Sequence, residues 1–343
     1  MNAGAPGSLA PCGAAAGVTA ARADAVACAG TAAPRRVAVA ASGGRDSTAL
    51  LHCTARAAAV LGIEVHALHV HHGLMPQADA WQMHVERQCR RWRLPFAAAR
   101  LDGAPSRGDS VEAWARRGRY RALAAMARAR GIGLVLLAHH RRDQAETFLL
   151  QALRGGGAAG LAAMPRLALR EGITWARPWL EMPRAAIDAY LQRHRLACVD
   201  DSSNQELRYA RSRLRRLVWP PLLEAFPDAE TTFARAAQRA AAEAEVLAEI
   251  GAADAAALRA DVRALSLSAW REFSAARRAN ALRIWLAGVL DAPVPETLVR
   301  RLAAELPAAA HGQWPAPGGR LRLRRGRLQF EPAPPRADRA AAT

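Results

Sequence analysis

The sequence predicts an α/β protein with a doubly wound parallel sheet, followed by a mainly helical C-terminal domain. Three observations lead to this prediction. Short apolar runs alternate with helical stretches from residue 35 to residue 153, as in parallel sheets covered by helices on both faces. Polar segments directly follow the first, second and fourth of these runs. Beyond residue 226 the chain becomes alanine-rich, with the spacing of helices.

The expected elements of the first domain follow one another in a regular order. Strands are predicted at residues 37–41, 65–70, 96–101 and 134–138. The helices between and after them are predicted at residues 48–61, 78–93, 110–130 and 143–153. A hairpin is possible over 166–180, and Pro183 opens a helix that runs to residue 194. Right-handed crossovers in such a sheet place ligands outside the carboxyl ends of its strands.

The domain boundaries are expected where the composition changes. Residues 1–33 are rich in alanine and glycine and are interpreted as a flexible extension. The catalytic α/β domain is predicted over 34–226, and a mainly helical domain over 227–331, with helices at 228–258 and 268–289. A short strand-like pair lies near residues 321–323 and 328–330. Residues 332–343 resemble a loose tail.

The charge balance excludes some chemistries and favours one class of partner. The 343 residues include 48 basic and 30 acidic side chains, and every basic one is arginine. Without lysine there is neither a Walker-type phosphate loop nor a lysine Schiff base. A net charge of +18 favours a polyanionic partner, nucleic acid first. The alternative is a solvated basic surface that reflects the base composition of the genome.

The cysteines indicate a reducing compartment. Five stand at positions 12, 28, 53, 89 and 198, an odd number without a CxxC pair. This pattern argues against a disulfide framework, a zinc ribbon and a cysteine-held iron–sulfur cluster, and it favours the cytoplasm. No apolar run has the length of a membrane span, so no membrane partner is expected.

The segment after the first strand has the composition of an anion-binding loop. It reads Ser42-Gly43-Gly44-Arg45-Asp46-Ser47. The glycines permit a sharp turn, and the loop leads into a helix N-terminus, whose amides favour an anion. Asp46 would repel a phosphate unless a cation such as Mg²⁺ lay between them. The structural alternative is an ordinary strand-to-helix turn with Asp46 as a helix cap.

This loop resembles the pyrophosphate-binding loop of the ATP pyrophosphatase (PP-loop) superfamily, whose members cleave ATP to AMP and pyrophosphate. The resemblance implies a Rossmann-like fold of the adenine nucleotide alpha hydrolase type. It also assigns ATP binding to residues 42–47 and a Mg²⁺ contact to Asp46.

Further segments resemble the tRNA(Ile)-lysidine synthetase family within this superfamily. They are residues 69–74 (His-Val-His-His-Gly-Leu), 138–147 (Ala-His-His-Arg-Arg-Asp-Gln-Ala-Glu-Thr), 153–157, 160–164, 177–178, 201–204 and 211–215. The resemblance extends over residues 35–226. Two positions depart from the family pattern: Arg142 replaces an aspartate and Ser212 replaces an asparagine.

The resemblance implies that free L-lysine is attached to C2 of the wobble cytidine of a tRNA(Ile) with a CAU anticodon. The cytosine oxygen would attack the α-phosphate of ATP, and the lysine amine would then displace AMP. A carboxylate must hold or deprotonate the lysine ammonium, and Asp143 is the candidate. His139 would assist near the phosphates or the base, although plain hydrogen bonding at a strand end is the alternative. A homodimer is also plausible by resemblance.

Two groups of arginines are candidate binding residues. Arg116, Arg119 and Tyr120 share one predicted helix, and the resemblance places them near the phosphates, the lysine or the tRNA. A second group is dense enough to contact a tRNA backbone, and no acidic residue interrupts it: Arg208, Arg211, Arg213, Arg215 and Arg216.

Two other functions remain open from the sequence. A tRNA thiolase of the same superfamily would need reactive cysteines, and Cys53, Cys89 and Cys198 are isolated in the sequence. A non-catalytic RNA-binding relative would have lost the reactive side chains, but Asp46, His139 and Asp143 are all present.

Overall fold

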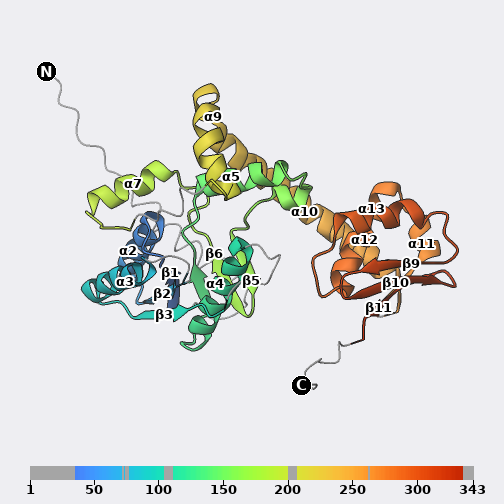
Figure 1. Cartoon of the computed structure of the whole chain (residues 1–343), viewed down its shortest axis with the longest axis horizontal. Helices are drawn as coiled ribbons and strands as arrows, with labels where there is room; N and C mark the ends of the chain where they lie inside the picture. The colour runs from blue at the N-terminus through green and yellow to red at the C-terminus, as the bar shows by residue number, and fades with distance from the viewer. Residues whose placement is uncertain are drawn as a thin grey trace, which may run out of the picture. The chain divides into compact units, whose positions relative to one another are not determined.

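The computed structural model describes residues 35–71, 73, 77–103, 111–199, 207–261 and 263–334. The chain divides into two compact units, Met1–Ala241 and Ala242–Thr343 (Figure 1). The predicted extension over 1–33 lies outside the described residues, as do His72, the 201–204 segment and most of the predicted tail. No helix among the described residues is long and apolar enough to cross a membrane.

The first unit is built on a six-stranded sheet that confirms the predicted α/β class. Its strand order is β3-β2-β1-β4-β6-β5, and all neighbours pair in parallel except the β5–β6 hairpin. The strands are β1 (Arg36–Ala40), β2 (Glu64–His71), β3 (Phe96–Arg100), β4 (Leu134–Leu136), β5 (Leu167–Arg170) and β6 (Ile173–Ala176). The β4 strand lies beside β1 because the chain reverses its direction of winding there, which creates a ligand-binding edge.

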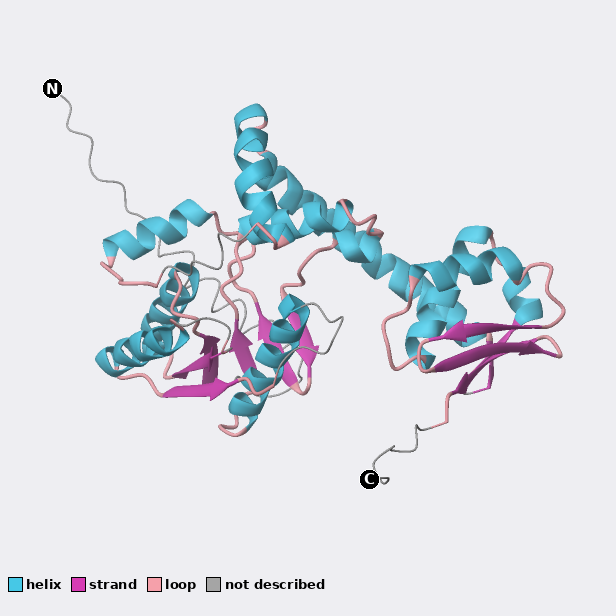
Figure 2. Cartoon of the chain, in the orientation of Figure 1, coloured by secondary structure: helices cyan, strands magenta, loops and turns pink. Residues whose placement is uncertain are grey.

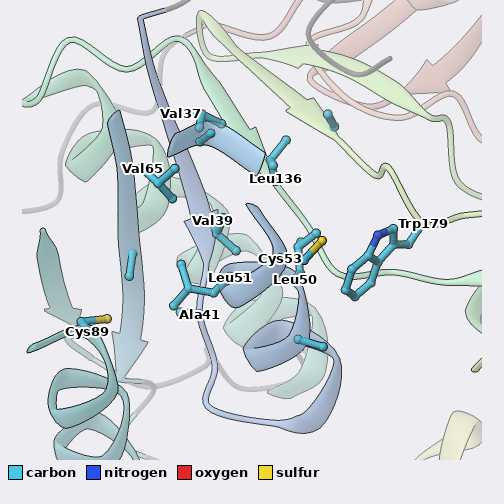
Figure 3. Packing of buried hydrophobic residues seen from close by; sticks show 14 of the residues in the cluster. Val37, Val39, Ala41, Leu50, Leu51, Cys53, Val65, Cys89, Leu136 and Trp179 are labelled. Atoms are coloured by element: carbon cyan, nitrogen blue, oxygen red, sulfur yellow. The ribbon is translucent and has the colours of Figure 1, made fainter. Parts of the chain in front are cut away.

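Helices cover the two faces of this sheet. One face packs against α2 (Arg45–Val60), α3 (Ala78–Trp92) and α7 (Arg184–Arg193), and the other packs against α4 (Val111–Arg128). Each face of the sheet carries a hydrophobic core. Alternate residues of β1 pack into the two cores, because successive strand side chains point to opposite faces. Val37 and Val39 lie in the first core with Leu50, Leu51 and Trp179 (Figure 3), whereas Ala38 lies in the second.

Short helices extend from the carboxyl edge of the sheet. They are α5 (Arg141–Ala152), α6 (Ala158–Leu161), α8 (Ala210–Arg213) and α9 (Trp219–Ala225). Between α8 and α9 the residues Leu214–Val218 form one π-helical turn, η2. The arginine-rich segment is therefore not one regular helix. The π turn changes which side chains face the same way, and such turns often occur at functional sites.

The second unit combines helices with more strands than the sequence predicted. Its strands form a sheet, coloured magenta in Figure 2. The sheet has five strands in the order β7-β8-β11-β10-β9. The strands are β7 (Arg259–Asp261), β8 (Ala264–Ser266), β9 (Gly312–Ala316), β10 (Gly319–Arg324) and β11 (Arg327–Pro332). Only β10 and β11 were expected. The others are too short, or in β9 contain a proline, so they lack a clear two-residue period.

The helices of the second unit follow the prediction more closely. They are α11 (Leu267–Arg271), α12 (Ala275–Val289) and α13 (Glu296–Glu305), of which α13 was not expected. The helix expected over 268–289 is broken at Ser274, whose hydroxyl accepts a hydrogen bond from the Arg277 amide and caps α12. The long helix α10 (Ala229–Ala257) begins just after the predicted boundary at 226, and the division between the compact units falls within it.

A histidine in the first unit is expected to make stability depend on pH. His52 Nδ1 lies 2.9 Å from the Tyr190 hydroxyl, and its ring contacts those of Trp92 and His194. Burial, with His194 and Arg56, lowers the pKa of His52 to about 4. Between pH 6.5 and 4 the unfolded chain therefore binds more protons at this site than the folded chain does.

The melting temperature is thus expected to fall as the pH falls through this window, and His52→Gln should reduce that fall. Thermal denaturation at several pH values measures it, with His311→Gln at an exposed position as the control. If both variants show the same pH dependence as the parent, His52 does not contribute.

Candidate active site

The loop at residues 42–47 has the backbone of an anion site. It follows β1 and leads into α2, and Gly43 has φ +87°. A Cβ on Gly43 would lie 3.0 Å from a Val85 methyl, so only glycine fits without strain. The Ser42 and Ser47 hydroxyls lie 2.9 Å apart, and Ser47 Oγ donates to the Gly44 carbonyl at 3.0 Å. The loop is preformed at a helix N-terminus, where an anion is favoured.

The side chain of Arg45 is held by another helix. Its guanidinium lies 2.5 Å from Asp188 Oδ1 on α7. In this arrangement Arg45 contributes its backbone to the predicted ATP-binding loop, while its charge is paired with a carboxylate. The hydroxyls and amides of the loop remain the donors for a phosphate.

The sheet order brings three strand ends into a row. Because β1, β4 and β6 are neighbours, the loop at 42–47 lies beside the histidines that follow β4 and beside Arg177 after β6. His140 bridges two elements: its Nε2 lies 3.8 Å from Asp46 Oδ2 and 3.5 Å from Asp143 Oδ2. The structure thus brings the predicted Asp46 and Asp143 together around a buried histidine that the sequence did not single out.

The side chain of Asp46 has one oxygen without a hydrogen-bond partner among the described residues. Its Oδ1 is buried and has no hydrogen-bond partner in the described structure. Burial raises the pKa of Asp46, His140 partly offsets the shift, and Asp143 adds to it. A cation at this oxygen would offset both the burial and the carboxylate repulsion.

Asp143 lies in the opposite electrostatic environment. Its Oδ1 pairs with Arg215 at 2.9 Å, and its Oδ2 accepts the His140 amide at 3.1 Å, which caps the start of α5. Burial alone would raise the pKa of Asp143, but His140, His139 and the guanidinium groups of Arg211 and Arg215 lower it below its usual value. Asp143 is therefore held as an ionised carboxylate.

His139 is held neutral. Burial lowers its pKa to about 3; Asp143 opposes the shift, and Arg177, Arg119 and Arg211 contribute to it. Its Nδ1 is buried and has no hydrogen-bond partner among the described residues. A neutral imidazole at this edge can accept or donate a hydrogen bond, but it adds no positive charge to the site.

Glu146 is the main feature that the sequence interpretation left without a role. It is fully buried, and its two oxygens accept bonds from Arg215 Nε at 2.8 and 3.0 Å. Arg211 lies 3.4 Å away and Arg142 3.8 Å away. Its position three residues after Asp143, on the same face of α5, is the signal that could have identified it.

The arginines predicted to contact tRNA divide into two groups. Arg211 and Arg215 turn toward α5: Arg211 Nη2 donates to Thr147 Oγ1 at 2.6 Å, and Arg215 joins Asp143 to Glu146. Arg208, Arg213 and Arg216 are exposed. The first group contacts Asp143, Glu146 and Thr147, and the second group faces solvent.

The predicted set on α4 lies beside Arg177. The guanidinium groups of Arg116 and Arg119 lie 5.7 and 5.9 Å from the centre of the Tyr120 ring. Arg177 is buried and donates to the Tyr120 hydroxyl at 3.3 Å and to the Pro165 carbonyl at 2.8 Å. Burial alone would raise the pKa of Tyr120, but Arg177, Arg116 and Arg119 lower it. This concentration of positive charge suits an anionic group.

Comparisons with known proteins are consistent with this geometry. Residues 19–222 match the PP-loop domain family, and residues 265–329 match the TilS substrate binding domain family. A tRNA(Ile)-lysidine synthase from Bordetella bronchiseptica is 43% identical, over 84% of this chain and 88% of the relative. Another from Burkholderia mallei is 44% identical, over 88% of this chain and 62% of the relative.

A solved structure is similar in fold to part of this chain. The U34-tRNA thiolase NcsA from Methanococcus maripaludis, solved with its 4Fe-4S cluster, has a TM-score of 0.52 and 13% identity. The similarity covers 60% of this chain and 70% of that chain. At this identity it supports the architecture alone.

Proposed function

This chain belongs to the tRNA(Ile)-lysidine synthase family, and from that premise we propose that it joins free L-lysine to C2 of the wobble cytidine of a tRNA(Ile) with a CAU anticodon. The reaction consumes ATP and releases AMP and pyrophosphate. The proposal includes a cytoplasmic location, where lysine, ATP and tRNA are available together, and a homodimer.

One observation supports the separate roles that we propose for Asp46 and Asp143. Asp46 and Asp143 share the buried His140, yet their pKa values are displaced in opposite directions, upward for Asp46 and downward for Asp143. Such pairs mark a division of chemical roles between two carboxyl groups. Asp143, which stays ionised, suits an ammonium group and the proton it must lose. Asp46, with its unpartnered oxygen, suits a cation beside the phosphates.

The side chains divide the proposed reaction into two steps. The loop at 42–47 binds the phosphates of ATP while the cytosine C2 oxygen attacks the α-phosphate and pyrophosphate leaves. Asp143 then holds the lysine ammonium and takes its proton, so the neutral amine attacks C2 and AMP departs. Neutral His139 offers a hydrogen bond to the base or the phosphates. The arginines near Tyr120 stabilise negative charge that develops on the leaving groups.

The residues at the loop fit a magnesium ion. The buried, unpartnered Oδ1 of Asp46 is the hard oxygen ligand that Mg²⁺ prefers. The described residues contain no group of three or more histidine, cysteine, aspartate or glutamate side chains arranged to hold a metal. An ion at Asp46 would be held by one or two carboxylates and by the phosphates of the substrate. Mg²⁺ would supply neutralisation of phosphate charge at Asp46.

The thiolase alternative is less well supported. Cys53 and Cys89 lie in the hydrophobic core of the first unit (Figure 3). Burial, with Glu86, raises the pKa of the Cys89 thiol to about 12, which leaves it unreactive. Cys12 and Cys28 lie outside the described residues.

The proposal is tested by incubating the protein with ATP, Mg²⁺, radiolabelled lysine and an unmodified tRNA(Ile) that carries a CAU anticodon. Incorporation of lysine into this tRNA, and not into a transcript with a different anticodon, is expected. Folded protein that binds ATP but incorporates no lysine would contradict the proposed activity. Sedimentation at several concentrations tests the homodimer.

The exposed arginines predict a salt effect on tRNA binding. Arg213→Ala combined with Arg216→Ala should weaken binding and make the slope of log K against log salt less steep by about one to two, since each lost phosphate contact reduces it by about one. Filter binding at several salt concentrations measures the slope. Arg121→Ala with Arg128→Ala, on the exposed side of α4, provides the control. An unchanged slope would place the tRNA surface elsewhere.

A further inference from the structure

The described part of the first unit contains a surface hollow. It is open to solvent, has a volume of about 290 Å³ and is lined by Val111, Glu112, Arg208, Tyr209, Ala210 and Arg213. Its walls come from the start of α4 and from the segment that leads into α8. Its volume is close to the lower limit of small-ligand pockets, about 300 Å³.

The side chains of this pocket, residues 111–112, 208–210 and 213, have the chemistry of nucleotide recognition. The Arg208 guanidinium lies 4.8 Å from the centre of the Tyr209 ring, so a planar cation and an aromatic ring line one wall. Arg213 is held at the rim by bonds from Nη1 to the carbonyls of Leu207 and Arg208, at 3.0 and 2.9 Å. These bonds use one of its three nitrogens. Proteins bind unpaired bases by such stacking, with arginine on the phosphate.

Glu112 favours a base that carries an exocyclic amino group. It is the only carboxylate among the described residues that line the pocket, so it would repel a phosphate placed beside it. A carboxylate accepts hydrogen bonds from exocyclic amino groups of bases, as glutamate does with cytosine N4. The pocket therefore favours a base that presents an amino group to Glu112 and a phosphate to the arginines.

Both elements that form the pocket also carry residues that contact the proposed reaction centre at Asp143 and Arg177. On α4, Glu112, Arg116 and Tyr120 stand four residues apart and share one face, and Tyr120 is bound by Arg177. On the other wall, Arg211 lies between the pocket residues Arg208 and Arg213, and its Nη2 lies 3.4 Å from the Asp143 carbonyl. A nucleotide in the pocket would thus adjoin a nucleotide that reacts beside Asp143.

We propose that this pocket holds the adenosine that follows the target cytidine in the CAU anticodon. Its base stacks on the Tyr209 and Arg208 wall, its N6 amino group donates to Glu112, and its phosphate contacts Arg213. This inference rests on the proposed function, since it takes the target nucleotide from it. It adds a site that holds the target cytidine in place by fixing its neighbour.

The test is a double-mutant cycle between protein and RNA. The tRNA carries adenosine, purine riboside without the amino group, or an abasic nucleotide at this position. The proteins are the parent, Tyr209→Ala, Glu112→Ala and, as the control, Arg121→Ala. The dissociation constant of each complex is measured by filter binding, and lysine incorporation is measured in parallel.

Loss of the base is expected to weaken binding to the parent and to Arg121→Ala about tenfold, as for one stacked base, but to change binding to Tyr209→Ala by less than about twofold. The parent should prefer adenosine to purine riboside, and Glu112→Ala should lose that preference. Equal losses in the parent and in both variants would overturn the proposal. Glu112 lies on an exposed helix surface, so its variant remains informative if Tyr209→Ala fails to fold.

The binding cycle separates this inference from the proposed activity. Coupling in the binding data without lysine incorporation by the parent would contradict the proposed reaction but retain the pocket. Lysine incorporation by the parent without coupling at this position would contradict the pocket alone.

Discussion

Replacement of Asp143 by asparagine is expected to reduce lysine transfer by about 100- to 10,000-fold, the contribution usual for a positioned acid or base. The amide has nearly the shape of the carboxylate, and its oxygen can still accept the His140 amide that caps α5. It carries no charge, however, so it can neither hold an ammonium group nor take its proton. Binding of tRNA and ATP should change by only a few-fold.

The measurement is single-turnover incorporation of lysine with saturating ATP and tRNA, so that weaker binding does not contribute. Glu64→Gln is the matched control, because Glu64 also pairs with an arginine, Arg36 at 2.8 Å, but stands at the amino end of β2, at the opposite edge of the sheet. A folded Asp143→Asn protein with the parent rate would remove Asp143 from the mechanism.

Most of the first unit could be predicted because its elements are marked by local patterns. Strands such as β1 and β4 are short apolar runs, and the loop at 42–47 is a turn that needs glycine at Gly43. The strand order β1-β4-β6 is not local information. It decides that Arg177, far along the chain, lies at the same edge of the sheet as His139, and no local pattern in the sequence shows this.

The sequence did not predict which arginine side chains point toward the protein interior. A dense basic segment predicts a surface for phosphates, but density does not say which side chains turn inward. The π turn at Leu214–Val218 follows Arg211 and contains Arg215, and both side chains reach carboxylates or backbone of α5. Glu146 is fully buried, and buried acids are usually paired, but the sequence alone does not show this burial.

Replacement of Arg215 by methionine is expected to destabilise the first unit and to lower transfer at the same time. Arg215 bonds both oxygens of the fully buried Glu146 and one oxygen of Asp143. Its removal leaves Glu146 with the longer contacts to Arg211 and Arg142. Breaking a buried pair on one side costs about 3 kcal/mol, which corresponds to a melting temperature roughly 6–12 °C lower. As the control, Arg216→Met replaces the neighbouring arginine, which is exposed, and should change the melting temperature little.

A second variant separates stability from chemistry. In Arg215→Met with Glu146→Leu no buried carboxylate is left at position 146, so most of the lost melting temperature should return. Transfer should not return, because Asp143 Oδ1 has lost the Arg215 contact at 2.9 Å that positions it, and loss of this guanidinium also raises the pKa of Asp143. The remaining activity should therefore fall further as the pH decreases, since protonated Asp143 cannot take a proton from lysine. If the double variant recovers both the melting temperature and transfer, Arg215 acts only on the fold. If Arg215→Met melts like the parent, the buried pair does not stabilise the first unit.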